Sequence, residues 1–350
     1  MKGSQVGIIG GGIAAAVIIA VLFVSMGTQN DAVPLPIEND VVIPSEDKFL
    51  VYTTFYPLYQ FTQGVAGDAA DVRILIPSNG DPHSFELGPK TIVDLTKADM
   101  LVYNGAGFEP YIDEIMSSSD FDHIIFVDSS EGITLMEGEV HDHSSHGSHG
   151  DEKHDDHAKE DGHDDHAEEG DMDHTYDPHI WLDPILAKSQ VMTIADHLKE
   201  SDPEHADIYH DNAISYANQL DLLDQEIRSE VSSCAKDTFV PFHNAFSYFA
   251  ERYDLNTLAV IQEFSPETPV TAKDIEELIH FAEDNDIKYF FTEENRNPRI
   301  AERLATELGG DILLFSPLES LSAKDDPDTT YFDKMRQNVD NLQIALECSS

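Results

Sequence analysis

Nine histidines lie close together in one acidic segment of the chain, residues 141–174, where they alternate with Asp, Glu and Gly. The imidazole side chain suits Zn, Cu and Ni, so this composition is typical of transition-metal binding. The segment has almost no large apolar side chain to offset the entropy of ordering, so we expect a mobile loop. The alternative is a solvated acidic insertion without a ligand. The candidate accessory metal ligands are His141, His143, His146, His149, His154, His157, His163, His166 and His174.

Three further histidines stand apart from this segment. His83 and His179 share the local sequence Asp-Pro-His, and His243 lies where an expected strand meets a helix. Proline fixes the backbone before the histidine, and aspartate can accept a hydrogen bond from the backbone or from the far imidazole nitrogen. A lone histidine beside an apolar strand is more often a hydrogen-bonded structural residue, which is the alternative here. The repeated motif favours metal ligands.

Alternating apolar runs and amphipathic segments surround these histidines. The apolar runs predict buried strands at residues 49–53, 72–76, 100–103 and 124–127, and again at 239–242, 257–261, 288–292 and 312–315. The helices expected between and after them cover residues 57–65, 89–97, 109–116, 245–252, 271–285, 298–308 and 331–346. This alternation is typical of the α/β class with parallel sheets covered on both faces. Two such sets predict two Rossmann-like lobes.

A long helical stretch separates the two sets, and the turn signal Ser201-Asp202-Pro203 should break or kink it. We therefore expect an N-terminal lobe at 48–183 that includes the histidine-rich acidic loop at 139–174, a rigid linking helix at 184–231 and a C-terminal lobe at 232–350. Open α/β sheets bind ligands beyond the carboxyl ends of their strands. His83 and His243 occupy that position in different lobes, so a ligand held by both would lie in the cleft between the lobes.

The N-terminus predicts export from the cytoplasm. Residues 6–26 contain no charged side chain and are long enough to span a bilayer. Residues 1–28 therefore form either a cleaved signal segment or a retained transmembrane anchor, and the length favours the anchor. Residues 29–47 resemble a tether. No cysteine follows the apolar run, which excludes bacterial-type lipid attachment at that point.

The charge and the cysteines agree with an exported protein. The formal net charge of −48 over 350 residues repels nucleic acid and anionic lipid, and it attracts cations. Cys234 and Cys348 are compatible with a disulfide in an oxidising compartment, although their separation in space cannot be read from the sequence.

Four stretches of the chain resemble a known family, the metal-binding solute receptors of ABC importers for zinc and manganese (cluster A-I). The matching residues are 78–113, 177–184, 242–255 and 261–279, and the resemblance covers residues 48–348. It implies two α/β lobes, a backbone helix and a metal ion in the cleft, for delivery to a membrane permease and its ATPase. Zinc-type members often carry a loop rich in histidine and acid directly before the second ligand histidine, as this chain does.

The resemblance places the three metal ligands on His83, His179 and His243. Manganese-type members usually have a glutamate at the third position, whereas imidazoles suit zinc, so the cargo that it implies is Zn(II). The chain departs from the family at Ser316, where many members have a ligating aspartate. The fourth position stays open between water and three carboxylates, Glu86, Glu293 and Glu294.

The resemblance implies an extracytoplasmic, monomeric receptor that captures Zn(II) through three histidines and performs no covalent chemistry. The alternatives are a manganese-type receptor or an adhesin of the same family, and a zinc hydrolase that activates water at an open fourth position. The chain contains no HExxH sequence, which disfavours the hydrolase. For the histidine-rich loop we expect low-affinity capture of zinc, which either raises the local zinc concentration near the cleft or senses zinc abundance.

Overall fold

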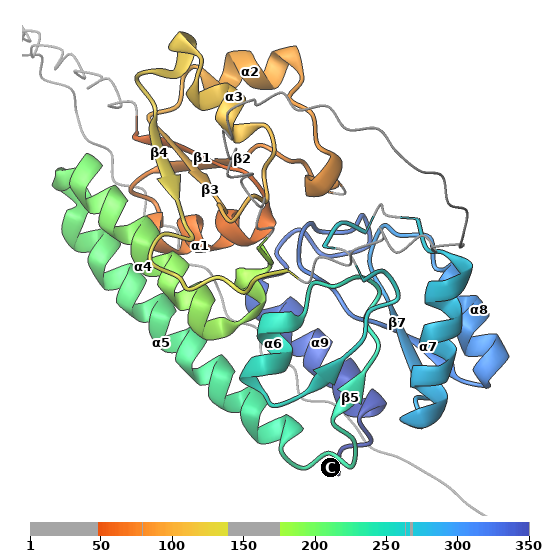
Figure 1. The fold of residues 1–350 in the computed structure, drawn as a ribbon. Helices are drawn as coiled ribbons and strands as arrows, with labels where there is room; N and C mark the ends of the chain where they lie inside the picture. Colours follow the sequence, from red (N-terminus) through yellow and green to blue (C-terminus); the bar gives the residue numbers. More distant parts are fainter. Residues whose placement is uncertain (1–47, 79, 139–175, 263, 267–268, 350) are drawn as a thin grey trace, which may run out of the picture. The chain divides into compact units, whose positions relative to one another are not determined.

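The fold is known from a computed structural model, which describes residues 48–78, 80–138, 176–262, 264–266 and 269–349 (Figure 1). Within these ranges no helix combines the length and the apolar character needed to cross a bilayer. The predicted anchor, the tether and all nine loop histidines lie outside the described residues. The predicted α/β class and the two-lobe arrangement are confirmed.

The N-terminal lobe is built on a parallel sheet whose strand order is β2-β1-β3-β4. Its strands are β1 (Leu50–Thr53), β2 (Asp71–Ile74), β3 (Met100–Tyr103) and β4 (Ile125–Asp128), and its helices are α1 (Tyr56–Ala66), α2 (Pro89–Leu95) and α3 (Ile112–Met116). The two central strands, β1 and β3, are buried along nearly their whole length. This burial explains why both read as continuous apolar runs in the sequence.

Two helices link the lobes, α4 (Pro184–Ser201) and α5 (Ala206–Val231), and they lie side by side (Figure 1). The expected single helix is therefore a pair, because the predicted break at residues 201–203 reverses the chain. Asp183 caps the start of α4, where its carboxylate accepts hydrogen bonds from two backbone N–H groups. The apolar face predicted for the second half is buried on α5, at Tyr209, Ala213, Tyr216, Leu220, Leu223 and Ile227.

The C-terminal lobe holds two short parallel strand pairs, β5 with β6 and β7 with β8. The strands are β5 (Thr238–Phe239), β6 (Asn256–Thr257), β7 (Tyr289–Thr292) and β8 (Asp311–Leu314), and the helices are α6 (Ser247–Arg252), α7 (Ala272–Asp284), α8 (Arg299–Leu308) and α9 (Tyr331–Ala345). A parallel bridge between Val240 and Phe290 places β5 beside β7. β5 is shorter than expected because Pro241 has no N–H group to donate to the ladder.

A disulfide between Cys234 and Cys348 joins the segment after α5 to the segment after α9. The structure thus contains the disulfide that the sequence left open. The bond closes the C-terminal lobe, since the two cysteines lie near its first and last residues.

Candidate metal centre

Four side chains from separate segments converge on one point of the structure. They are His83, His179, His243 and Glu319, and their candidate ligand atoms all lie within 4.8 Å of one another. His83 follows β2, His243 follows β5 and Glu319 follows β8, whereas His179 lies just before α4. Three of the four thus lie beyond the carboxyl ends of strands, as the α/β rule predicts.

The carboxylate of Glu319 lies in the middle of the three imidazoles. Its Oε1 is 3.0 Å from Nε2 of His83, 3.4 Å from Nε2 of His243 and 3.7 Å from Nε2 of His179. Nε2 of His179 and Nε2 of His243 are 3.3 Å apart. The side chains of His179 and His243 are fully buried, and those of His83 and Glu319 nearly so.

A carboxylate orients each of the two fully buried histidines. Oδ1 of Asp177 lies 2.8 Å from Nδ1 of His179, and Oε1 of Glu293 lies 2.5 Å from Nδ1 of His243. Each contact leaves the Nε2 atom facing the other members of the cluster. Such partners fix the tautomer and raise the basicity of a ligating imidazole.

His83 is positioned by a short turn, the 3₁₀ helix at Pro82–Ser84. Its backbone N–H donates to Oδ1 of Asp81 at 3.0 Å, so the predicted capping role of this aspartate is confirmed. The ring packs against Phe108, with 5.0 Å between the ring centroids. At His83 the aspartate of the Asp-Pro-His motif thus contacts the backbone of the histidine. At His179 the matching Asp177 contacts both the backbone N–H and the ring.

An unusual backbone turn delivers Glu319 to the cluster. Leu318, the residue before it, is buried and has a φ of +60°, a conformation that costs a side chain of this kind of order 1–3 kcal/mol. The hydroxyl of Ser316 accepts a hydrogen bond from the N–H of Leu318 at 3.1 Å. The side-chain amide of Asn338 clamps Ser316 by donating to its carbonyl and accepting from its N–H, both at 2.7 Å.

The indole of Trp181 adds a fourth hydrogen bond to this segment. Its Nε1–H donates to the carbonyl of Pro317 at 2.8 Å. Trp181 also packs beside His179, with 5.2 Å between the ring centroids. One buried side chain therefore links the segment that carries His179 to the segment that carries Glu319.

The carboxylates favour the protonated form of the buried imidazoles. Burial disfavours the charged form of His243, but Glu293 and Glu319 outweigh burial and raise its pKa to about 10. Burial opposes the charge on His179 too, yet its hydrogen bonds to Asp177 and Glu319 raise its pKa. Burial would raise the pKa of Glu319, but the charge of His83 and hydrogen bonds from the histidines hold it well below its usual value. A divalent cation entering this centre would displace protons.

Glu319 occupies the fourth place in the cluster, and none of the carboxylates considered from the sequence does. Glu86 is exposed, Glu293 supports His243, and Glu294 pairs with the buried Lys334. The signal that could have identified Glu319 is its place just beyond the carboxyl end of β8. Its reach into the cluster depends on the left-handed turn at Leu318, which no local sequence pattern predicts.

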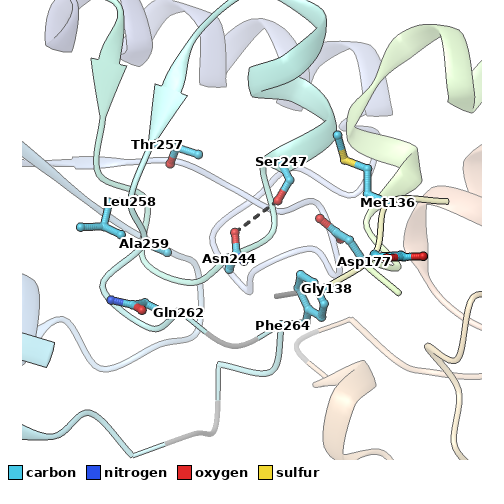
Figure 2. Close-up of a pocket in the computed structure, with 11 residues that line it drawn as sticks. Met136, Gly138, Asp177, Asn244, Ser247, Thr257, Leu258, Ala259, Gln262 and Phe264 are labelled. Carbon is cyan, nitrogen blue, oxygen red and sulfur yellow. Dashed lines mark hydrogen bonds between the residues drawn. The ribbon is translucent and has the colours of Figure 1, made fainter. Parts of the chain in front are cut away.

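A cavity of about 500 Å³ adjoins the cluster. Figure 2 shows its lining residues, which are Met136, Glu137, Gly138, Asp177, Asn244, Ser247, Thr257, Leu258, Ala259, Gln262 and Phe264. Asp177 belongs both to this wall and to the support of His179. The ring of Phe264 lies 6.1 Å from the ring of His179, centroid to centroid. The cavity and the buried centre thus share Asp177 as a common wall residue.

The chain matches a known protein family. Residues 51–345 match the family model described as "Zinc-uptake complex component A periplasmic". The chain belongs to this family. The resemblance predicted from the sequence is therefore confirmed.

The similarity to individual members extends over most of the chain. The high-affinity zinc uptake system protein ZnuA of Bacillus subtilis (strain 168) is 34% identical over 301 residues, which are 86% of this chain and 88% of that protein. The zinc-binding protein AdcA of Streptococcus pyogenes serotype M3 is 34% identical over 304 residues, 87% of this chain but 57% of AdcA. The chain thus spans little more than half of that longer relative.

The fold also matches solved structures. A crystal structure of a Zn(II)-bound mutant variant of AdcAII from Streptococcus pneumoniae superposes with a TM-score of 0.71 at 28% sequence identity. The match covers 86% of this chain and 99% of that one. The described fold is therefore that of a metal-binding solute receptor.

Proposed function

We propose that this protein is an extracytoplasmic receptor that captures Zn(II) between its two lobes and delivers it to a membrane permease of the ABC class. The observation that carries the proposal is the convergence of His83, His179, His243 and Glu319 within 4.8 Å. Zinc binds nitrogen and oxygen ligands, and four of them in a tetrahedron make a closed site. Three imidazoles and one carboxylate supply such a set.

The donor set favours zinc over manganese. Carboxylate, carbonyl and water oxygens suit Mn(II), whereas imidazole nitrogen suits Zn(II). His243 supplies the third imidazole, and its Nδ1 contact with Glu293 leaves Nε2 facing the centre. The cargo that this arrangement fits best is therefore Zn(II).

The same geometry disfavours a hydrolase. Zinc enzymes keep an open coordination position where the metal activates water or substrate. Glu319 would fill that position here, because its Oε1 lies within 3.7 Å of all three imidazole Nε2 atoms. Capture and release of the ion, without covalent chemistry, is the activity that a closed site supports.

Location and partners follow from the family and from the N-terminal sequence. The matching family is described as periplasmic, and residues 6–26 are uncharged and long enough to span a bilayer. We propose a monomer held at the membrane by this segment, or secreted if it is cleaved, that meets a permease and its ATPase. The histidine-rich loop would collect zinc at low affinity and raise its concentration near the cleft.

A zinc titration with manganese as competitor tests the proposal. The full chain and a chain lacking residues 139–173 are titrated side by side. The fluorescence of Trp181, the only tryptophan in the chain, reports on the centre because its ring lies 5.2 Å from the ring of His179. We expect one tight zinc site in both proteins, extra weak sites only with the loop, and no displacement by equimolar manganese. Tight zinc binding by a loop-deleted variant in which His83, His179 and His243 are all alanine would contradict the proposal.

A further inference from the structure

Arg296 connects the two lobes beside the metal centre. It lies in the loop between β7 and α8 of the C-terminal lobe, and its Nη1 is 3.1 Å from Oδ2 of Asp81 in the N-terminal lobe. The two side chains are only 14% and 23% exposed. An ion pair so shielded from water is stronger than one on an open surface.

The guanidinium lies between the groups that support two ligands from opposite lobes. Asp81 binds Arg296 through Oδ2 and the backbone N–H of His83 through Oδ1. Glu293 binds His243 through Oε1, and its Oε2 lies 4.0 Å from Nε of Arg296. Oε2 of Glu293 is buried and accepts no hydrogen bond from the part of the chain that the structure describes. The planar guanidinium of arginine directs its N–H donors toward two carboxylates at once, whereas the ammonium group of a lysine cannot do so in the same geometry.

A small cavity places Arg296 at the rim of the centre. Its volume is about 80 Å³, and its wall includes Asp81, Glu293, Arg296 and the ligand candidate Glu319. Movement of the His83 segment away from the C-terminal lobe at this rim would require the contact between Arg296 and Asp81 to break.

We propose that Arg296 is a positioning residue that holds the His83 segment against the C-terminal half of the centre and thereby slows the release of zinc. The inference rests on the proposed function, since it assumes that zinc occupies the cluster. A positive charge near Zn(II) would by itself speed release through repulsion. Positioning and charge therefore predict opposite signs when Arg296 is replaced.

The rate of zinc release separates these two effects. Full-length protein loaded with less than one equivalent of zinc is mixed with excess EDTA, and Trp181 fluorescence follows the loss of the ion. Groups that orient metal ligands typically contribute 10–100-fold to metal affinity, so we expect Arg296→Gln and Arg296→Lys each to release zinc at least about tenfold faster. The control is Arg303→Gln on α8, whose side chain is 64% exposed and pairs with Glu307. It removes the same charge, and we expect no change in rate.

Two results would overturn the inference. Slower release from Arg296→Gln, with Arg296→Lys at the wild-type rate, would show that the arginine acts only through its charge. Unchanged rates in both variants would show that it does not act on the centre. Should Arg296→Gln fail to fold by circular dichroism, the lysine variant alone decides, because positioning predicts faster release and charge predicts no change.

A double-mutant cycle tests the route through Asp81. Asp81→Asn removes the charged partner of Arg296 but keeps an oxygen that can accept from the N–H of His83. If the arginine acts through this aspartate, Arg296→Gln speeds release much less in the Asp81→Asn background than in the wild type. Additive effects would contradict that route. If zinc does not change the fluorescence of Trp181 in the wild-type protein, that result would instead contradict the proposed function itself.

Discussion

His83 and Glu319 face each other across the metal centre, with 3.0 Å between Nε2 and Oε1, yet the structure supports them in different ways. His83 is carried by a single 3₁₀ turn at Pro82–Ser84, and nearby Ser84 and Glu86 are exposed. Its capping residue, Asp81, is partly exposed and is held in turn by Arg296. His83 is thus presented on a lightly packed segment.

Glu319 follows a segment whose hydrogen bonds are all buried. Asn338, Ser316 and Trp181 are at most 2% exposed, and together they fix the backbone on both sides of Pro317. The left-handed turn at Leu318 persists because these bonds and the burial of its side chain over-determine it. The C-terminal half of the centre is therefore preformed, and we expect zinc to leave by movement of the His83 segment.

Removal of a ligand should have the largest effect and should distinguish the two halves. A structural zinc site contributes roughly 10–16 kcal/mol, so one of four ligands is worth on the order of 3 kcal/mol, or about a hundredfold in affinity. We expect this loss for His83→Ala and for His243→Ala, measured by competition with a chelator. His243→Ala should also lower the free energy of unfolding of the metal-free protein by about 1–3 kcal/mol, because the buried Glu293 loses its imidazole partner and keeps only the backbone N–H of residue 243.

Denaturant unfolding of the two metal-free variants measures their free energies of unfolding. Equal losses in His83→Ala and His243→Ala would contradict a lightly packed His83 segment beside a preformed C-terminal half of the centre.

The pH dependence of zinc binding should follow the buried histidines. Glu293 and Glu319 hold the pKa of His243 at about 10 against the opposing effect of burial, and the pKa of His179 is raised as well. Zinc binds neutral imidazole, so a proton must leave His243 at any pH below its pKa. Each displaced proton makes the affinity rise by up to about tenfold per pH unit there, and binding weakens as the pH falls. Titration calorimetry in buffers of different ionisation enthalpy at pH 7 should detect proton release. A pH-independent affinity between pH 6 and 9 would be inconsistent with these pKa shifts.

The two hydrogen bonds between Asn338 and Ser316 should contribute to zinc affinity as well as to the stability of the fold. Asn338→Ala removes both hydrogen bonds that fix the segment before Glu319, so we expect zinc affinity to fall about tenfold. The matched control is Asn341→Ala on the same helix, since Asn341 donates instead to the carbonyl of Leu314 in β8. Chelator competition on both variants should show a loss only for Asn338→Ala, and equal losses would mean that these two bonds act merely through the stability of α9.

The disulfide should have the smallest effect on zinc. Replacing Cys234 and Cys348 by serine should lower the free energy of unfolding by about 2–4 kcal/mol, because the bond closes a loop that spans 114 positions of the sequence. The zinc affinity of the folded protein should stay unchanged. A large loss of affinity would show that the centre is less preformed than the hydrogen bonds around Glu319 indicate.

The sequence predicted the parts of the centre that depend on local chemistry. The Asp-Pro-His motifs place His83 and His179 through a hydrogen bond to a residue two positions away, and the junction at His243 follows from strand and helix periodicity. Glu319 and Arg296 escaped prediction because tertiary contacts place them. The turn before Glu319 depends on Asn338, 22 residues beyond Ser316, and Arg296 meets Asp81 across 215 positions of the sequence.

The most direct test of the metal centre is anomalous diffraction at the zinc absorption edge from a crystal of the zinc-loaded protein. We expect one strong peak bounded by Nε2 of His83, His179 and His243 and by a carboxylate oxygen of Glu319, each at about 2.0–2.2 Å from the ion. A principal peak elsewhere, or a zinc ion in this cluster that Glu319 does not contact, would contradict this expectation.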